Sequence, residues 1–258
     1  MPIVFLMYHE LEIEGRKLVQ SGPGYVRYIL PLETFRSQME WVKKSGFDGL
    51  SVGEAIRYPR QPSVCITFDD GCETDLIAAA PILKELGCRA TFYLTAGFLG
   101  TPGYLRSEQV QELDALGFEI GCHSMTHPYL PDLSELELRR EIADAKTQIE
   151  QVLGQAVEHF SCPGGRYDRR TLEMARHAGF RSVANSHFHA NSASTSRYEL
   201  GRVALLRDMP GEEFAAVCRG NGLWKKRLQD RARASVRWAL GNRTYDRVRA
   251  SLLGEHSN

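Results

Sequence analysis

The chain has 258 residues, 43% of them apolar, which is enough to bury the core of one catalytic-sized domain. Its 32 basic and 32 acidic residues cancel, so the net charge gives no indication of a nucleic-acid partner. The first ten residues, MPIVFLMYHE, lack the positive region of a signal peptide and hold an apolar run too short to cross a membrane. The six cysteines form no CxxC pair, which is typical of free thiols in a reducing compartment. We therefore predict a cytoplasmic protein.

Short β-branched runs alternate with helical patterns, which indicates βαβ units around a parallel sheet or barrel. Strands are expected at residues 3–9, 47–52, 63–68, 89–95, 118–124, 159–165 and 201–206. Helices, each followed closely by a glycine, are expected at residues 34–44, 74–86, 107–116, 134–153 and 168–177. Thr34, Ser107 and Ser134 are the expected N-terminal caps. Beyond Phe180 the periodicity weakens, and residues 186–199, SHFHANSASTSRYE, are predicted to be a loop before the last strand.

The last part of the chain differs in charge from the rest. Residues 221–258 carry nine basic and three acidic residues, a net charge of +6, with Trp224 and Trp238 among the apolar positions. We predict a catalytic domain over residues 1–220 and a basic amphipathic helical tail over 221–258. Two placements of the tail stay open. It can dock on the domain with its basic face in water, or it can contact the anionic inner face of a membrane peripherally.

Polar clusters follow three of the expected strands. The motifs TFDD, GCHSMTH and SCPGG each lie where a strand ends and the next helix has yet to begin. In parallel α/β folds these positions meet at the carboxyl edge of the sheet, where ligand sites form. We therefore expect Asp69, Asp70, His123, His127 and the loop 161–165 to share one rim.

The side chains of this rim suit a divalent metal. Asp69 and Asp70 lie on opposite sides of the chain if strand alternation continues through them, so the two carboxylates can do different work. One carboxylate with His123 and His127 makes a three-ligand set that leaves positions open for water and substrate. Simpler interpretations exist, because DDG is a common turn sequence and HxxxH is an ordinary pair on a helix. Pro128 and the preceding strand argue against a helix here.

Taken together and in this order, TFDDG, HSMTH and the proline-glycine loop resemble the motifs of NodB-type polysaccharide deacetylases, carbohydrate esterase family 4. LMYHE also looks like the opening strand of bacterial members, and the resemblance covers residues 1–206. It implies an irregular, seven-stranded (β/α) barrel. It also implies a metal-dependent hydrolase that removes N-acetyl groups from N-acetylhexosamine units of a polysaccharide or glycan precursor.

The resemblance also implies roles for individual residues. Asp69 matches the general base, and Asp70, His123 and His127 match the metal ligands. Zinc is the expected metal, although this ligand set also accepts cobalt, manganese or iron. The resemblance also assigns binding of the substrate and the oxyanion to Pro163, Gly164 and Gly165. In this assignment the Gly164 N–H donates a hydrogen bond to the oxyanion.

Two motifs depart from the family pattern. Ser161 stands where many members have an arginine, and Arg166 is a candidate substitute. Arg207 stands where members often have the histidine that protonates the leaving amine, and arginine cannot donate a proton at neutral pH. His187 and His189, in the preceding loop, are the candidates for that general acid.

Three other residues lie beside these motifs. His9, at the end of the first strand, is either part of the site or a support beneath it. Cys72 and Cys122 flank the expected ligands, and strand alternation turns Cys122 away from His123 and into the core.

Two other functions stay open beside the deacetylase. Asp70, His123 and His127 match the 2-His-1-carboxylate triad of iron oxygenases, although such a site gives Asp69 no evident task. The departures at Ser161 and Arg207 fit a catalytically weak carbohydrate-binding or scaffold protein of the same fold.

Overall fold

The computed structural model describes residues 2–57 and 62–223, so nearly all of the predicted basic tail lies outside the described residues. The strands are β1 Val4–Tyr8, β2 Leu11–Glu12, β3 Leu30–Pro31, β4 Asp48–Leu50, β5 Ser63–Phe68, β6 Thr91–Leu94, β7 Glu119–Cys122, β8 His159–Ser161, β9 Ser182–Ala184 and β10 Val203–Ala204. The helices are α1 Pro23–Val26, α2 Leu32–Lys44, α3 Val52–Arg57, α4 Ala80–Glu85, α5 Ser107–Ala115, α6 Glu135–Arg139, α7 Ala145–Leu153, α8 Arg169–His177 and α9 Gly211–Cys218. Two π-helical segments, η1 Asp75–Ala79 and η4 Arg140–Asp144, precede α4 and α7, and short 3₁₀ turns lie at η2 Ala96–Phe98, η3 Leu130–Asp132 and η5 Pro163–Gly165. Within the two described ranges, no helix combines the length and the apolar character needed to cross a bilayer.

The main sheet is parallel and curls into an open barrel. Its strands follow the order β10-β1-β5-β6-β7-β8-β9, and β4 pairs with β5 beside this path. At the far edge Leu200 forms a parallel bridge with Ala184 of β9, just before the chain enters β10. The two ends of the sheet therefore approach each other through residues 197–200. This arrangement confirms the expected irregular (β/α) barrel.

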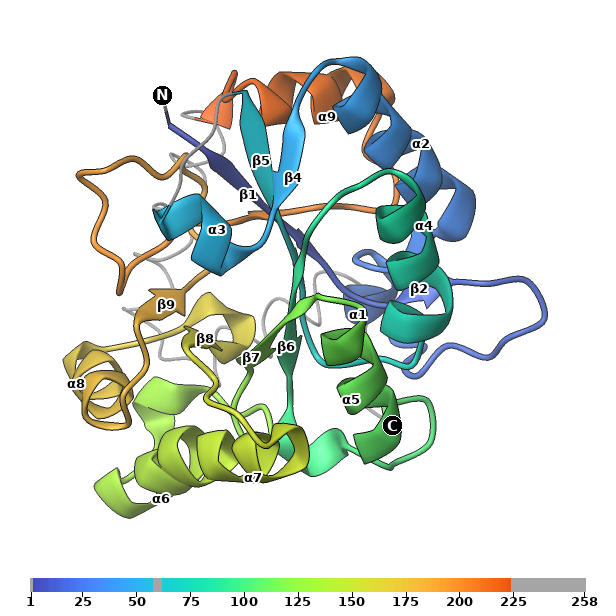
Figure 1. Ribbon diagram of the computed structural model, residues 1–258. Helices are drawn as coiled ribbons and strands as arrows, with labels where there is room; N and C mark the ends of the chain where they lie inside the picture. The colour runs from blue at the N-terminus through green and yellow to red at the C-terminus, as the bar shows by residue number, and fades with distance from the viewer. Residues whose placement is uncertain (1, 58–61, 224–258) are drawn as a thin grey trace.

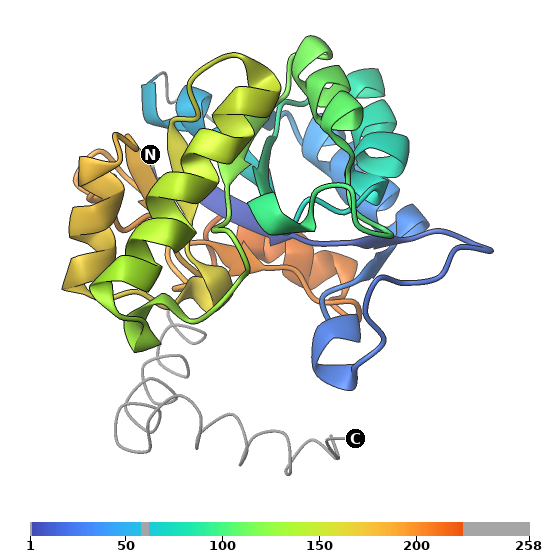
Figure 2. The same ribbon diagram turned by 90° about the horizontal axis from the view of Figure 1, so that it is seen from below.

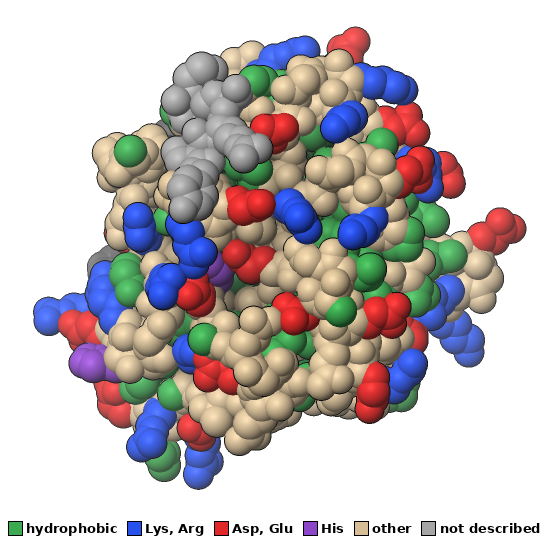
Figure 3. Space-filling view, in the orientation of Figure 1, with side chains coloured by type: hydrophobic (Ala, Val, Ile, Leu, Met, Phe, Trp, Pro, Cys, Tyr) green, Lys and Arg blue, Asp and Glu red, His purple; other side chains and the backbone are tan. Residues whose placement is uncertain are grey.

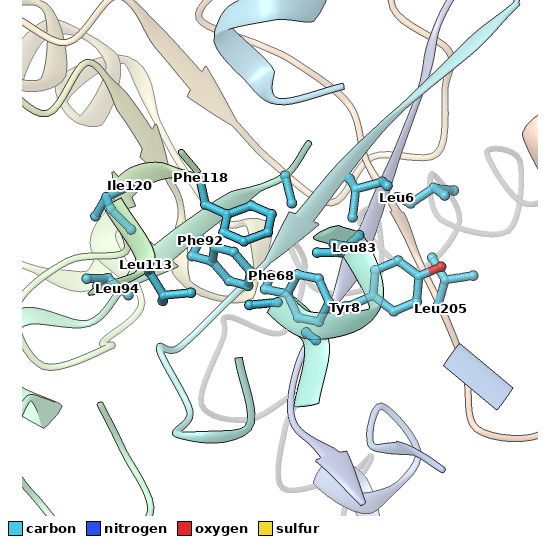
Figure 4. Packing of buried hydrophobic residues seen from close by; sticks show 14 of the residues in the cluster. Leu6, Tyr8, Phe68, Leu83, Phe92, Leu94, Leu113, Phe118, Ile120 and Leu205 are labelled. Carbon is cyan, nitrogen blue, oxygen red and sulfur yellow. The ribbon is translucent and has the colours of Figure 1, made fainter. Parts of the chain in front are cut away.

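Helices α2, α4, α5, α7 and α8 succeed one another around the outside of this sheet (Figure 1). Turned by 90°, the molecule shows α6 and α7 crossing in front of the strands (Figure 2). Between sheet and helices, the Phe68 ring stacks on Tyr8 and Phe92 at centroid distances of 5.2 and 5.0 Å, as Figure 4 shows. Full burial of each such ring stabilises the fold by about 1.5–3 kcal/mol. This row of rings joins β1, β5 and β6, and the Asp69–Asp70 motif follows the central one of these three strands.

The opposite, amino-terminal edge of the sheet is closed by a buried polar cluster. The Glu119 carboxylate accepts hydrogen bonds from the Gly53 N–H at 3.0 Å and from the Thr91 hydroxyl at 2.5 Å. His159 lies 3.5 Å from the same carboxylate and 2.8 Å from the Ser182 hydroxyl. On the face that carries α3, acidic and basic side chains are intermixed, without a large area of one sign (Figure 3). This edge is therefore filled, which leaves the carboxyl edge for a ligand.

Two predicted helix caps differ from the structure, and one strand of the structure was not predicted. Helix α2 begins at Leu32, and Thr34 lies inside it rather than at its cap. Helix α5 takes Arg106 rather than Ser107 as its cap, whereas Ser134 caps α6 as predicted. Strand β9 was not predicted, whereas the predicted loop at residues 186–199 contains no named helix or strand. Strand β9 has three residues, all buried, so no alternation of polar and apolar residues marks it in the sequence.

Candidate active site

Asp69 and Asp70 follow β5 directly, and the backbone separates their side chains. The Asp69 N–H still donates to the Tyr8 carbonyl of β1 at 3.0 Å, in the manner of a strand residue. Asp70 has a φ of +79°, a left-handed conformation that is uncommon outside glycine, and Gly71 continues the turn with a φ of +78°. Both carboxylates are buried, with 2% and 4% of their surface exposed. The turn lets them take different partners although they are adjacent in sequence.

His123 follows β7 and is held by its first ring nitrogen. Its Nδ1 lies 2.8 Å from the Ser161 carbonyl oxygen, and because a carbonyl only accepts, Nδ1 carries the proton. The unprotonated Nε2 lies 3.6 Å from Oδ1 of Asp70 and 3.6 Å from Oδ2 of Asp69. Burial lowers the pKa of His123 to about 4, so the ring is neutral near pH 7. A neutral imidazole with its Nε2 directed at a carboxylate is the form that binds metal.

His127 reaches the same place through a strained loop rather than a helix. Ser124 and His127 both have positive φ values, of 68° and 62°. Glu141, from the π-helical segment η4, shapes the loop by accepting hydrogen bonds from the Met125 and Thr126 N–H groups at 2.9 and 2.8 Å. His127 Nε2 thereby lies 3.6 Å from Asp70 Oδ1. Non-glycine residues at positive φ persist where surrounding contacts hold them, often at functional sites.

The three predicted ligands therefore converge. One ligand atom from each of Asp70, His123 and His127 lies within 4.8 Å of the others. Asp70 Oδ1, the oxygen that faces both imidazoles, is buried and has no hydrogen-bond partner among the described residues. A buried carboxylate oxygen rarely stays unpartnered unless a cation or water belongs there. One oxygen and two imidazole nitrogens fit zinc, and also cobalt, manganese or iron.

Asp69 takes a different partner, Arg202. Nη1 and Nη2 of Arg202 lie 2.7 Å from Oδ1 and Oδ2 of Asp69 respectively, and the arginine is fully buried. Burial on its own raises the pKa of Asp69. The Arg202 guanidinium, aided by His123, outweighs burial and holds that pKa well below its usual range. Asp69 is therefore ionised at neutral pH.

Arg202 is the functional residue that the sequence analysis missed. Its Nη2 also donates to the Ser161 hydroxyl at 2.7 Å, so the serine at the family's arginine position contacts an arginine that immediately precedes β10. Arg166, the predicted substitute, instead places its guanidinium 3.5 Å from the centre of the Tyr129 ring. The signal that could have identified Arg202 is a charged residue within the apolar run GRVALL, because a buried charge requires a partner.

The loop at η5 offers one backbone donor for an oxyanion. Pro163 has no N–H, and the Gly165 N–H donates to the Cys162 carbonyl at 2.8 Å. Gly164 is exposed, has a φ of +59°, and its N–H has no partner among the described residues. A Cβ at this glycine would lie 3.0 Å from the Tyr129 ring, so the ring closely approaches the Gly164 backbone.

The imidazoles predicted as general acids lie in the loop before β10. The His187 ring is 5.8 Å from the Tyr167 ring, and the His189 ring packs against Gly201. His9, at the end of β1, has a buried Nδ1 without a hydrogen-bond partner in the described chain. Burial lowers the pKa of His9, whereas the neighbouring carboxylates of Asp70 and Asp69 oppose that shift. The charges of both carboxylates thus act on the His9 imidazole, which is not a predicted metal ligand.

Arg207 and the two flanking cysteines serve the scaffold. Arg207 donates to the Ile29 carbonyl at 3.1 Å and pairs with Glu12, which anchors the chain after β10 to that before α2. Cys72 and Cys122 are free and fully buried. Cys122 packs within the main apolar cluster, as strand alternation predicted.

Comparison with known proteins agrees with this geometry. Residues 57–183 match the family model described as polysaccharide deacetylase. YxkH of Bacillus subtilis, which carries the polysaccharide deacetylase name, is 30% identical over 217 residues, 82% of this chain and 74% of the relative. A chitooligosaccharide deacetylase of Azorhizobium caulinodans is 32% identical over 52% of this chain and 63% of its own length. The Streptococcus pyogenes deacetylase PplD, solved with acetate, superposes with a TM-score of 0.74 at 26% identity, covering 83% of this chain and 97% of that one. The chain therefore belongs to the polysaccharide deacetylase family, whose members are hydrolases acting on carbon–nitrogen bonds.

Proposed function

We propose that this protein is a metal-dependent hydrolase that removes N-acetyl groups from N-acetylhexosamine units of a polysaccharide or glycan precursor. The observation that carries the proposal is that two adjacent carboxylates, Asp69 and Asp70, have different partners in the same site. Oδ1 of Asp70 has no hydrogen-bond partner among the described residues and faces two imidazoles. Asp69 pairs with Arg202, and its Oδ2 lies 3.6 Å from His123, one of the same two imidazoles. Deacetylation needs both a metal ligand and a separate base at one place, and relatives carry the names of such enzymes.

Asp70, His123 and His127 are the residues that hold the metal in this proposal. A bound divalent ion supplies Lewis acidity toward the acetyl carbonyl and lowers the pKa of a water molecule. Asp69 accepts the proton of the attacking water at Oδ2, the oxygen 3.6 Å from His123 Nε2. Arg202 keeps Asp69 ionised and fixes the plane of its carboxylate through two contacts.

The remaining steps use the loop at η5 and the end of β1. The water oxygen bonds to the acetyl carbon, and the Gly164 N–H donates to the oxyanion that forms. The carbon–nitrogen bond then breaks to give acetate and a free amine on the sugar. We assign to His9 the proton that the amine nitrogen requires. His9 follows Tyr8, whose carbonyl accepts the Asp69 N–H, and the buried Nδ1 of His9 is unpartnered in the described chain.

Acetate release tests the proposal. Purified protein loaded with zinc or cobalt should release acetate from chitooligosaccharides, and both chelation and Asp69→Asn should abolish release. The Asp69→Asn variant should still bind metal, because Asp69 is not among the three ligands. Folded, metal-loaded protein that releases no acetate from any N-acetylated sugar would contradict it. Oxygen uptake with Fe(II) and a 2-oxoacid would favour the oxygenase instead, and sugar binding without turnover would favour the scaffold.

A further inference from the structure

A projecting segment of the chain, residues 13–29, reaches the candidate metal site. It leaves β2, extends from the body at the right of Figure 1, and returns through α1 to β3. Figure 2 shows the same segment projecting beside the sheet. Its one direct hydrogen bond to a predicted ligand comes from α1, where the Tyr25 hydroxyl donates to Oδ2 of Asp70 at 2.8 Å. A surface segment thus contacts a carboxylate that is 4% exposed.

This hydrogen bond distinguishes the two oxygens of Asp70. Oδ2 accepts from Tyr25, whereas Oδ1 has no partner among the described residues and lies 3.6 Å from Nε2 of both imidazoles. A carboxylate without such a partner can rotate about its last bond and present either oxygen, or both, to a cation. The phenol occupies one oxygen and so leaves a single, defined ligand atom directed at His123 and His127.

We propose that Tyr25 is a positioning residue for the metal ligand Asp70, and that its hydrogen bond couples metal binding to the placement of residues 13–29. The inference rests on the metal site of the proposed function, and Tyr25 itself binds neither the metal nor the substrate in it. Hydrogen bonds to ligating groups orient the ligand and tune its basicity, and losing one typically lowers metal affinity by about 10–100-fold. The coupling is reciprocal, so a bound metal also strengthens the hold on the segment.

Other contacts keep the segment in place when the phenol is altered. The Val19 N–H donates to the buried Glu10 carboxylate at 3.0 Å. Near the other end, Arg207 donates to the Ile29 carbonyl at 3.1 Å. Removing only the Tyr25 hydroxyl therefore tests the orientation of Asp70 without detaching the segment.

The decisive experiment compares zinc and cobalt affinity in wild type, Tyr25→Phe and Tyr198→Phe, measured by competition with a chelator. Tyr198 is a matched control, because its hydroxyl donates to the Phe180 carbonyl at 2.8 Å, away from the ligands. We expect Tyr25→Phe to bind about 10–100-fold more weakly and Tyr198→Phe to match wild type. The absorption spectrum of the cobalt form should also change in Tyr25→Phe alone, because the carboxylate is free to bind through both oxygens. Equal affinities and spectra in all three proteins would overturn the inference.

Limited proteolysis at the exposed Lys17 supplies a second readout. Metal should slow tryptic cleavage there in wild type and have less effect in Tyr25→Phe. Protection that is the same in both proteins would contradict the coupling. These outcomes remain distinct from failure of the proposed function, which would appear as wild-type protein that binds no metal or releases no acetate.

Discussion

Arg202 contacts both oxygens of Asp69, at 2.7 Å each, although the two residues are 133 positions apart in sequence. The bidentate geometry fixes the orientation of the carboxylate as well as its charge. A planar guanidinium can form this pair of contacts, whereas a lysine ammonium acts as a single point charge.

Arg202→Lys should therefore keep the charge but lose the orientation of the base. We expect kcat/KM for acetate release to fall about 100-fold, the scale of a small misplacement of a catalytic group. Metal affinity should be unchanged, because Arg202 donates its hydrogen bonds to Asp69 and to neighbouring groups that are not among the three predicted ligands. Activity equal to wild type would show that the charge alone suffices.

Arg202→Met should destabilise the metal-free protein by about 3–5 kcal/mol at pH 7, because the buried Asp69 loses its counter-charge. In wild type, the pKa of Asp69 is lower in the folded protein than in the unfolded chain. The ionised carboxylate therefore stabilises the fold at a pH above the unfolded-state pKa, and this stabilisation is lost as the pH falls through the folded-state pKa. In the variant, the pKa of Asp69 loses its main opposing influence and rises under the effect of burial, so Asp69 takes up a proton on milder acidification than in wild type. Urea unfolding should show a smaller difference in free energy of unfolding between wild type and Arg202→Met at pH 4 than at pH 7. A gap that is constant with pH would argue against an ionised Asp69.

His9→Gln should lower kcat for N-acetylated sugars by about 10²–10⁴-fold, the usual contribution of a general acid. An activated acetate ester, whose leaving group needs no proton, should be affected much less. Because burial lowers the pKa of His9, its protonated form is lost as the pH rises, and the variant should lack the corresponding fall in rate. His187→Gln and His189→Gln test the two loop histidines in the same assay. If either of them abolishes amide cleavage while His9→Gln does not, the assignment of His9 is wrong.

Asp75→Asn should stabilise the metal-free protein at high pH. Asp75 is fully buried in η1, neither of its oxygens has a partner among the described residues, and burial with nearby Asp70 and Asp69 raises its pKa well above the usual range. The folded protein therefore keeps a proton that the unfolded chain releases near pH 4, so wild-type stability falls as the pH rises above that value. We expect Asp75→Asn to gain at least about 1.4 kcal/mol at pH 8, the equivalent of one pKa unit, and to gain little at pH 4. Denaturant titrations of wild type and Asp75→Asn at both pH values measure this difference. If Asp75→Asn is less stable than wild type at pH 8, Asp75 is ionised and paired in the folded protein.

The barrel and the convergence of Asp70, His123 and His127 could be predicted from sequence, because both follow from where the apolar strands end. The ligands lie immediately after apolar strands, and parallel strands bring such positions to one edge whatever the intervening helices do. Strand β5 was predicted with its observed bounds, Ser63–Phe68, because its apolar run is continuous and flanked by polar residues.

Arg202 and Tyr25 could not be predicted in the same way, because their partners are set by tertiary contacts. Arg202 reaches Asp69 only because β10 pairs with β1, on the side of β1 opposite to β5. Tyr25 lies in a segment without strand or helix periodicity, so nothing local indicates that it turns back onto Asp70. Arg207 occupies the position that resembles a family motif in the sequence. Its side chain, however, donates to the Ile29 carbonyl and anchors the chain there.

The place of Arg202 in the chain also determines when activity can begin. During synthesis the metal ligands and Asp69 emerge long before β10, and a nascent chain that stops short of residue 202 buries an unbalanced negative charge if it folds. Contacts between such distant residues form late, because closing a long loop costs entropy before the contact compensates for it. Completion of the sheet by its last strand is therefore also the step that gives Asp69 its counter-charge, which the proposed hydrolysis requires.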